Sequence, residues 1–285
     1  MKSRTIAHIL KGETMRMGEF EVKQPLPTIR VDQIDPFLLL HHFGPISVAP
    51  GHDPIDLGPH PHRGFEPVTF LFSGGMRHKD SRGNEGLLNG GDVQWMTAGL
   101  GIIHSERASA TFKASGGVLE GIQLWVNLPK KYKMVQPRYQ DIKLAEMPII
   151  EEDKAKLTVV AGEFRGERGP AMTYSPILAI KADLQAGAET FVEIPAAYNA
   201  LAYILQGEVE LSSGFDYPGE TLLYFKKDGD GFSLKAKEDS RLLILAGEPI
   251  DEPVASWGPY VMNTQTEIME ALRDYQMGKM GVYVD

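Results

Sequence analysis

The chain has 285 residues, a formal net charge of −9 and no cysteine, which excludes disulfides, thiolate metal ligands and cysteine nucleophiles. With 42% hydrophobic and 24% charged residues, the composition is that of a folded globular protein and not of a disordered chain. The acidic balance disfavours direct nucleic-acid binding, and the sequence has neither an apolar run of ~20 residues nor a signal-peptide pattern, so we expect a cytoplasmic protein without membrane contact.

The first half of the chain alternates short apolar runs with turn residues. Runs with a period of two cover residues 68–72 (VTFLF), 76–80 (MRHKD), 93–96 (VQWM), 102–106 (IIHSE) and 121–128 (GIQLWVNL). Glycine, asparagine and aspartate separate them. Short strands with such turns at close intervals predict an antiparallel β-sandwich or barrel.

A charged segment follows at residues 129–156, marked by prolines and poor in regular apolar alternation. A chain of this length exceeds the usual size of a single core, so we expect two domains. We place the boundary inside this segment. The predicted domains are an N-terminal one of residues 1–134 and a C-terminal one of residues 135–285.

The second half repeats the rhythm of the first. Strand-like runs recur at residues 201–205 (LAYIL), 218–225 (PGETLLYF), 232–236 (FSLKA) and 241–247 (RLLILAG). Setting the turn "SGG" on "QGE" and the turn "GGD" on "PGE" superposes the two halves, which indicates an internal repeat of one β unit. The predicted fold class is therefore all-β, with two similar antiparallel β-barrels.

Near its end the sequence changes to a helical period of about 3.6. Ile268, Leu272 and Tyr275 lie on one side of this stretch, and Thr264 and Glu267 have the spacing of a capping box. The pattern predicts a C-terminal α-helix whose apolar stripe packs on a barrel.

Two short motifs contain residues suited to chemistry, "GPHPHRGFE" at residues 58–66 and "IIHSE" at residues 102–106. On a strand, residues i and i+2 project from one face about 7 Å apart, so His60 and His62 point together, as do His104 and Glu106. If the two strands are neighbours, three imidazoles and one carboxylate converge. This nitrogen and oxygen set suits Fe(II), Mn, Ni, Cu or Zn and leaves positions open for water, dioxygen or a chelating substrate.

Each motif alone is weak, because a His-x-His pair is usually a pair of surface histidines. The distribution of histidine strengthens the interpretation, since all eight histidines precede position 105 and the second half has none. In the internal repeat, Phe232 and Leu234 stand where His104 and Glu106 would be. A metal confined to the N-terminal domain accounts for this difference.

The sequence also resembles a known family. The segments "HPHRGFE", "GDVQWMTAGLGIIHSE" and "LILAGEPIDEPVASWGPYVMNT" resemble the pirin family of the cupin superfamily, and "DPFLLLHHFGP" fits as well. The resemblance runs nearly from end to end. It implies a bicupin whose first barrel holds iron through His60, His62, His104 and Glu106 and whose second barrel has no metal. It further implies quercetin dioxygenase activity or, as in animal pirins, iron-dependent nuclear co-regulation.

Two positions depart from the general cupin pattern. In most metal cupins the carboxylate ligand follows the His-x-His pair, at the place of Glu66, whereas the pirin pattern takes it from the second motif, at Glu106. Strand spacing does not decide between them, so the choice of Glu106 follows the family, and Glu66 is expected to hydrogen-bond to a ligand. The pair His41 and His42 stands where pirins often have an acidic residue first. His41 could lie at the edge of the pocket, but we expect it on the surface or in loop packing.

The expected function is that of an Fe(II) dioxygenase acting on O2 and a flavonol such as quercetin, in which the Glu106 carboxylate accepts the substrate hydroxyl proton. Phe65, Phe70, Phe72 and Trp95 are candidates for aromatic surface near the substrate, or for plain core. The alternative is a redox-sensing iron protein that acts through protein partners without catalysis. A further possibility is another small chelating metabolite as the natural substrate. Nothing in the sequence demands a dimer, so we expect a monomer.

Overall fold

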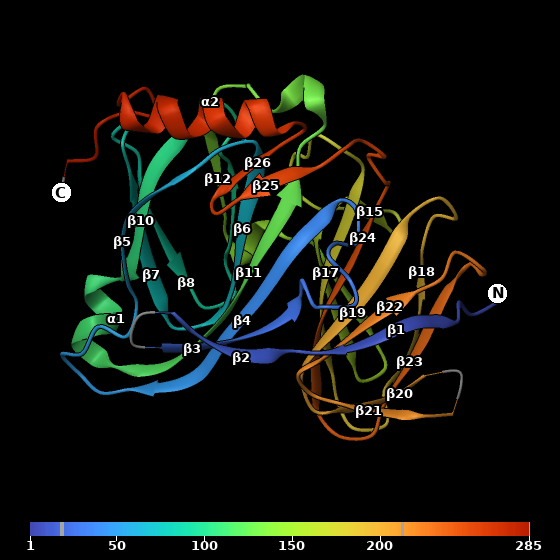
Figure 1. Cartoon of the computed structure of the whole chain (residues 1–285). Coiled ribbons are helices and arrows are strands. Elements are labelled where there is room, and N and C mark those ends of the chain that lie inside the picture. Colours follow the sequence, from blue (N-terminus) through green and yellow to red (C-terminus); the bar gives the residue numbers. More distant parts are fainter. Residues whose placement is uncertain (18–19, 212–213, 285) are drawn as a thin grey trace. The chain divides into compact units, whose positions relative to one another are not determined.

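The structure is a computed structural model that describes residues 1–17, 20–211 and 214–284 (Figure 1). In these residues it consists mainly of strands, with two α-helices, α1 (Ala110–Ser115) and α2 (Gln265–Gln276). Two 3-10 turns, at Lys130–Tyr132 and Leu144–Glu146, complete the regular structure. The predicted all-β class with a C-terminal helix is confirmed. None of the helices in the described ranges is long and apolar enough to cross a membrane.

The chain forms two compact units, and neither is continuous in sequence. Unit 1 comprises Met1–Glu13, Lys23–Pro36 and Ala145–Pro249, and unit 2 comprises Thr14–Val22, Phe37–Leu144 and Ile250–Asp285. The crossing from Leu144 to Ala145 falls within the charged segment 129–156. The predicted domains, 1–134 and 135–285, are each continuous in sequence and so differ from these compact units. The division of the chain into two folding domains at residue 134 stays a prediction.

Unit 2 contains most of one seven-stranded sheet, together with a four-stranded sheet. The seven-stranded sheet has the order β12 (Arg138–Ile142), β9 (Val93–Thr97), β6 (Phe65–Ser73), β11 (Gly117–Asn127), β4 (Phe37–Val48), β3 (Phe20–Leu26) and β2 (Glu13–Met17). The four-stranded sheet has the order β5 (Asp56–His62), β10 (Ile102–Ala108), β7 (Gly75–Asp80) and β8 (Glu85–Asn89). A hairpin of β25 (Ala255–Trp257) and β26 (Tyr260–Met262) precedes α2.

Unit 1 repeats this arrangement. Its seven-stranded sheet has the order β1 (Ile6–Lys11), β22 (Thr221–Phe225), β19 (Asn199–Gln206), β24 (Ser240–Gly247), β17 (Ile177–Leu184), β14 (Ala155–Ala161) and β13 (Ile149–Glu152). Its four-stranded sheet has the order β18 (Glu189–Glu193), β23 (Gly231–Ala236), β20 (Glu208–Leu211) and β21 (Asp216–Pro218), and β15 (Glu163–Phe164) pairs with β16 (Glu167–Arg168).

The strand orders of the two units agree with the internal repeat seen in the sequence. The order β9-β6-β11-β4 in unit 2 corresponds to β22-β19-β24-β17 in unit 1, and β5-β10-β7-β8 corresponds to β18-β23-β20-β21. Within the smaller sheets, His104 of β10 pairs with His60 of β5, and Phe232 of β23 pairs with Val192 of β18. The position of an imidazole in unit 2 is therefore occupied by an apolar side chain in unit 1.

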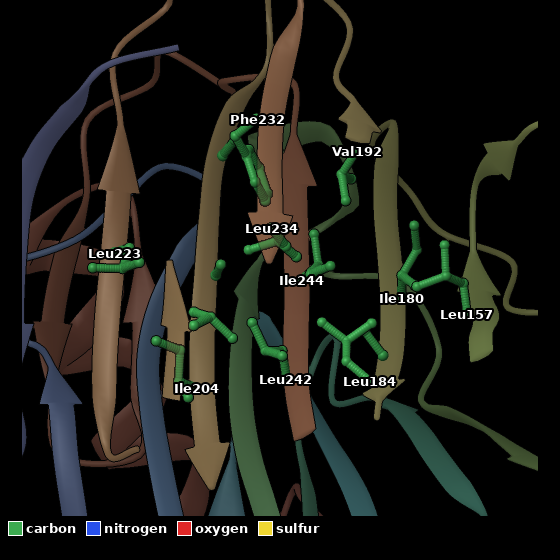
Figure 2. Packing of buried hydrophobic residues seen from close by; sticks show 14 of the residues in the cluster. Leu157, Ile180, Leu184, Val192, Ile204, Leu223, Phe232, Leu234, Leu242 and Ile244 are labelled. Carbon is green, nitrogen blue, oxygen red and sulfur yellow. The ribbon is translucent and has the colours of Figure 1, made fainter. Parts of the chain in front are cut away.

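The interior of unit 1 is filled by apolar side chains from both of its larger sheets. Phe232, Leu234 and Val192 are fully buried in this cluster together with residues of β17, β19 and β24, as Figure 2 shows. Burying a phenylalanine or leucine side chain contributes roughly 2 kcal/mol to folding. The core of unit 1 is thus an apolar counterpart of the interior of unit 2.

The C-terminal helix α2, drawn in red in Figure 1, begins as the sequence predicts. The Thr264 hydroxyl accepts a hydrogen bond from the backbone of Glu267, and the Glu267 carboxylate accepts one from the backbone of Thr264, which completes the capping box. Ile268 and Ala271 are buried against the β25–β26 hairpin. Tyr275, which the helical period placed on the apolar side, is 38% exposed, so the buried face is narrower than expected.

Candidate metal centre

Three histidines meet in unit 2, on the two neighbouring strands that the sequence analysis identified. His60 and His62 are on β5 and His104 is on β10, directly opposite His60 in the antiparallel ladder. The ring centres are 4.9 Å apart for His60 and His62, 4.4 Å for His60 and His104, and 4.9 Å for His62 and His104. One ring nitrogen from each lies within 4.8 Å of the others. This group can hold a metal ion.

The local backbone explains why the side chains converge. Pro61, between the two histidines of β5, pairs with Ile103 and points away from them, as strand alternation requires. Immediately after β5 the chain turns at Gly64, whose φ of 86° is left-handed and whose α-carbon lies against the Val261 carbonyl. A side chain at position 64 would collide with that carbonyl, so glycine is needed to end β5 directly after His62.

The ring nitrogens of these histidines have the pattern of metal ligands. His60 Nδ1 donates a hydrogen bond of 2.8 Å to the Gly58 carbonyl, which leaves Nε2 as a lone-pair donor. His62 Nδ1 and both nitrogens of His104 are buried without a hydrogen-bond partner. Burial, reinforced by the neighbouring imidazoles, lowers the pKa of His62 and of His104 well below the usual value, so both rings are neutral. Neutral imidazoles with free nitrogens fit a divalent metal.

The fourth predicted ligand, Glu106, is buried beside this group but is not among the atoms that lie within 4.8 Å of one another. The Gln123 amide donates to both of its carboxylate oxygens, at 3.4 and 3.3 Å, and the Thr69 hydroxyl donates at 3.4 Å. Burial raises the pKa of Glu106, while the nearby His60 ring and these two hydrogen bonds oppose the rise. Ligation by Glu106 stays a prediction.

Glu66, the alternative carboxylate, lies on the other face of its strand. On β6, Glu66 and Thr69 are three positions apart, so their side chains point to opposite faces, and Thr69 is the one that contacts Glu106. The Glu66 carboxylate instead accepts a hydrogen bond of 2.7 Å from the Thr97 hydroxyl. Burial raises the pKa of Glu66 to about 7. The expected hydrogen bond from Glu66 to a ligand is therefore replaced by one to Thr97.

The aromatic side chains near the histidines differ from those expected. Phe65 is in place, with its ring centre 5.2 Å from that of His62. Phe70 shares the opposite face of β6 with Glu66, Phe72 is partly exposed near the strand end, and Trp95 lies on the face of β9 that also holds Thr97. Of these four candidates, Phe65 contacts His62 of the candidate site.

Trp125 was missed by the sequence analysis. Its ring centre is 5.6 Å from that of His62 and 4.3 Å from that of Phe65, and the side chain is partly exposed. The alternation within "GIQLWVNL" places Gln123 and Trp125 on one face, which is the signal that could have identified both. Together Phe65 and Trp125 form a flat apolar surface beside His62.

A buried polar network on β7, β9 and β12 borders Glu106. His78 is opposite Glu106 in the ladder, and its ring is stacked on Tyr139 with centres 4.6 Å apart. The Gln94 amide contacts His78 and donates a hydrogen bond of 2.9 Å to Asp141. These residues supply further polar groups to the interior of unit 2, and no short motif in the sequence marks them.

The two histidines at positions 41 and 42 point to opposite faces of β4. His41 is opposite Gln123 and thus on the face shared with the candidate ligands, where burial lowers its pKa to about 4. His42 lies on the other face and its Nε2 is 3.3 Å from the Glu120 carboxylate. His41 therefore borders the site, instead of the surface or loop position expected for it.

Comparisons with known proteins bear on the whole chain. The family model Pirin matches residues 19–126, and the Pirin C-terminal cupin domain matches residues 179–281. The chain is 41% identical over 278 residues to Pirin-like protein 2 of Arabidopsis thaliana, covering 95% of this chain and 81% of the relative. It is 37% identical over 287 residues to Pirin of Rattus norvegicus, covering 98% and 94%.

Among solved structures, the crystal structure of a quercetin 2,3-dioxygenase from Acinetobacter baumannii superposes with a TM-score of 0.94. That protein is 37% identical in sequence, and the match covers 99% of this chain and 100% of that one. The similarity therefore extends over both compact units.

Proposed function

Because the chain belongs to the pirin family of the cupin superfamily, we propose that it is a mononuclear iron dioxygenase that cleaves flavonols such as quercetin with O2. The observation that supports this proposal is the set of buried imidazole nitrogens, without hydrogen-bond partners, at His62 and His104 beside His60. The similarity to a quercetin 2,3-dioxygenase suggests the substrate class. A cytoplasmic location and a monomeric state belong to the same proposal.

The donor set is compatible with the proposed metal. An Fe(II) ion held by the three histidines and Glu106 would supply Lewis acidity and open coordination positions for a chelating substrate and O2. The same nitrogen and oxygen donors suit Mn, Ni, Cu and Zn. Iron is therefore proposed from the family resemblance, and metal analysis of the purified protein tests it.

Glu106 has the environment of a general base. Hydrogen bonds from Gln123 and Thr69 orient its carboxylate, and burial raises its pKa above the ordinary glutamate value. A raised pKa makes the carboxylate a stronger proton acceptor than an exposed glutamate. In the proposed reaction, a Glu106 carboxylate oxygen takes the proton of the flavonol hydroxyl as the substrate binds.

The aromatic surface next to His62 suits a planar ligand. Trp125 and Phe65 lie against each other with their ring planes inclined by 35°, and Trp125 is partly exposed. A flat polyphenol can stack on the accessible part of the indole while its oxygen atoms reach toward the histidines. These two side chains would thereby orient the substrate and shield the reacting atoms from water.

The proposal is tested by loading the protein with Fe(II) under anaerobic conditions and then adding quercetin and O2. We expect oxygen uptake and loss of flavonol absorbance that exceed those of metal-free protein. Replacing the base in Glu106→Gln should lower kcat by about 10²-fold or more. No turnover above the metal-free protein would contradict the dioxygenase proposal. The regulatory alternative predicts instead that a protein partner is recovered differently with reduced and with oxidised protein.

A further inference from the structure

The residues next to the candidate metal ligands are bound by the C-terminal end of the chain. Residues 250–284 belong to unit 2, as do β5 and β10. After α2 the chain continues as a tail without regular structure, and Met280 in this tail is fully buried. The tail therefore has a defined position on unit 2.

One contact reaches the strand that holds two of the candidate ligands. Ser105 lies between His104 and Glu106 on β10, so its side chain points to the opposite face of the strand. On that face the Ser105 hydroxyl and the Tyr283 hydroxyl are 2.6 Å apart and share a hydrogen bond. The ammonium group of Lys79, the residue paired with Ser105 in the ladder, lies 5.9 Å from the Tyr283 ring centre.

The tail also contacts Ser81, the residue that follows β7, so closely that position 281 has no room for a side chain. The Ser81 hydroxyl donates a hydrogen bond of 2.8 Å to the Met280 carbonyl and accepts one of 3.2 Å from the backbone of Ile103. Gly281 has a left-handed φ of 96° and no room for a side chain against Ser81. The tail is thus hydrogen-bonded, through Ser81, to the residue that precedes His104.

A second contact reaches the other ligand strand. Arg63 follows His62 directly, is 3% exposed and pairs with Asp274 of α2 at 3.1 Å. Its guanidinium also donates to the Leu100 carbonyl at 2.7 Å. Asp274 is in turn paired with Lys279 at 2.8 Å. The end of β5 is therefore tied to α2 and to the start of the tail.

We propose that residues 274–283, which we call the C-terminal brace, hold the candidate metal ligands in position. They do so through contacts on the face of β10 opposite to the ligands and at the end of β5. In this proposal Tyr283 is a positioning residue that holds β10 through Ser105, and Asp274 holds the end of β5 through Arg63. The inference rests on the proposed metal site. Because a segment without regular structure detaches more readily than a central strand, release of the brace would loosen the ligand geometry and hasten metal loss.

The brace is tested with Co(II), whose visible absorption bands report the arrangement of its ligands. Tyr283→Phe removes one hydroxyl, Ser105→Ala removes its partner, and the double variant removes both. Val282→Ala, at a 74% exposed position of the same tail, is the control. The measurements are the rate of Co(II) transfer to excess EDTA, the spectrum of the bound ion and the melting temperature of the metal-free protein.

We expect each single variant to release Co(II) roughly fivefold faster, the factor expected for one hydrogen bond. The double variant should be no faster than either, because both changes remove the same bond. The bound spectrum should shift, the metal-free melting temperature should not, and Val282→Ala should match the wild type.

Wild-type release rates in Tyr283→Phe and Ser105→Ala would overturn the brace. So would equal acceleration by Val282→Ala, or a lower metal-free melting temperature with an unchanged Co(II) spectrum. Absence of Co(II) binding by the wild type would overturn the proposed metal site together with the brace. Co(II) binding without flavonol turnover by the iron protein would remove the dioxygenase proposal and leave the brace intact.

Discussion

At the scale of single residues, the partnerless nitrogens of His62 and His104 are the main sign of a ligand. Buried polar atoms are nearly always hydrogen-bonded, and each one left without a partner costs about 1–3 kcal/mol. Three such atoms lie together here, and the pKa shifts keep their rings neutral. A bound cation would satisfy His62 Nδ1 and the one nitrogen of His104 that has a lone pair in the neutral ring.

The first prediction concerns His62→Ala. We expect near-complete loss of bound metal with the fold retained, because the imidazole contributes a ligand atom whereas the β ladders of the two units do not depend on it. Metal content by mass spectrometry and circular dichroism measure the two effects. His52→Ala, at an exposed histidine of the same unit, is the control and should keep its metal. Full metal content in His62→Ala would show that His62 is not a ligand.

Trp125 carries the second prediction. Trp125→Leu removes the aromatic surface beside His62 and should raise KM for quercetin about twofold to tenfold, since aromatic contacts contribute about 0.5–1.5 kcal/mol beyond area burial. The metal content should not change. Trp257→Leu, at a 66% exposed indole of the same unit, should leave KM unaltered. Equal KM values in the two variants would argue against stacking on Trp125.

Glu66 gives a prediction about pH. Because burial raises its pKa in the folded state to about 7, the folded protein holds this proton more tightly than the unfolded chain. The resulting stabilisation is fully present below about pH 4.5 and is lost as the pH rises through about 7. In Glu66→Gln, the fall in unfolding free energy of the metal-free protein from pH 5.5 to 8 should shrink by roughly 1–3 kcal/mol.

Urea unfolding at the two pH values measures this difference. Glu151→Gln, at an exposed glutamate, serves as the control and should follow the wild type. A variant Glu66→Gln with the wild-type pH dependence would mean that Glu66 is ionised in the folded protein throughout this range.

At the scale of secondary-structure elements, one buried lysine joins three parts of unit 2. The Lys133 ammonium donates hydrogen bonds to the Gly64 carbonyl at 2.8 Å, the Asn127 side chain at 2.7 Å and the Val261 carbonyl at 2.9 Å. These acceptors belong to the turn after β5, to β11 and to β26. The lysine thus holds the β25–β26 hairpin against the strand end that bears His62.

Lys133→Met tests this connection. Methionine fills similar space but donates no hydrogen bond, so three buried oxygen atoms lose their hydrogen-bond donor and the unfolding free energy should fall by about 2–4 kcal/mol. Chemical denaturation followed by circular dichroism measures the loss. Lys131→Met, at an exposed lysine two residues away, should change stability by less than about 0.5 kcal/mol.

Several elements show which parts of the secondary structure local sequence patterns predict. The capping box of Thr264 and Glu267 and the strands around "VTFLF" and "IIHSE" formed where the sequence predicted them. The charged segment 129–156 was expected to contain a boundary, and it also contains β12 and β13. Apolar and polar residues alternate only weakly in these two strands, because β12 is only partly buried and β13 is an edge strand. Neither strand therefore needs a fully apolar face.

At the scale of the whole molecule, the two units have matching strand orders but different interiors. Unit 2 has the histidine group, while the described interior of unit 1 is an apolar cluster that includes Phe232 and Leu234. The equivalent β10 and β23 thus occupy the same place in their sheets with different side chains. Metal binding should therefore slow local opening in unit 2 and leave local opening in unit 1 unchanged.

Metal removal tests this difference by hydrogen exchange. A ligand that binds only the folded state stabilises it in proportion to its affinity, and it slows opening of the segments it joins. Chelation should speed amide exchange in β5, β10 and residues 274–283, while β17, β19 and β24 of unit 1 should exchange as before. Faster exchange spread equally over both units would contradict a site confined to unit 2.

Many features of this protein depend on residues that are close together in the sequence. Alternation, glycine turns and capping residues depend on contacts over a few positions, so the sequence alone determined the all-β class, the terminal helix and the shared face of His60 and His62. The repeat also indicated that Phe232 and Leu234 occupy the positions of His104 and Glu106.

Which strands lie side by side depends on packing between distant segments, and no local pattern contains it. Only the tertiary structure turned Glu66 toward Thr97, brought Trp125 beside His62 and set Tyr283 against the back of β10. Each of these contacts joins two different strands, or a strand and the tail after α2. They exist because segments distant in the sequence pack against one another, which fixes long-range neighbours that the order of residues leaves open.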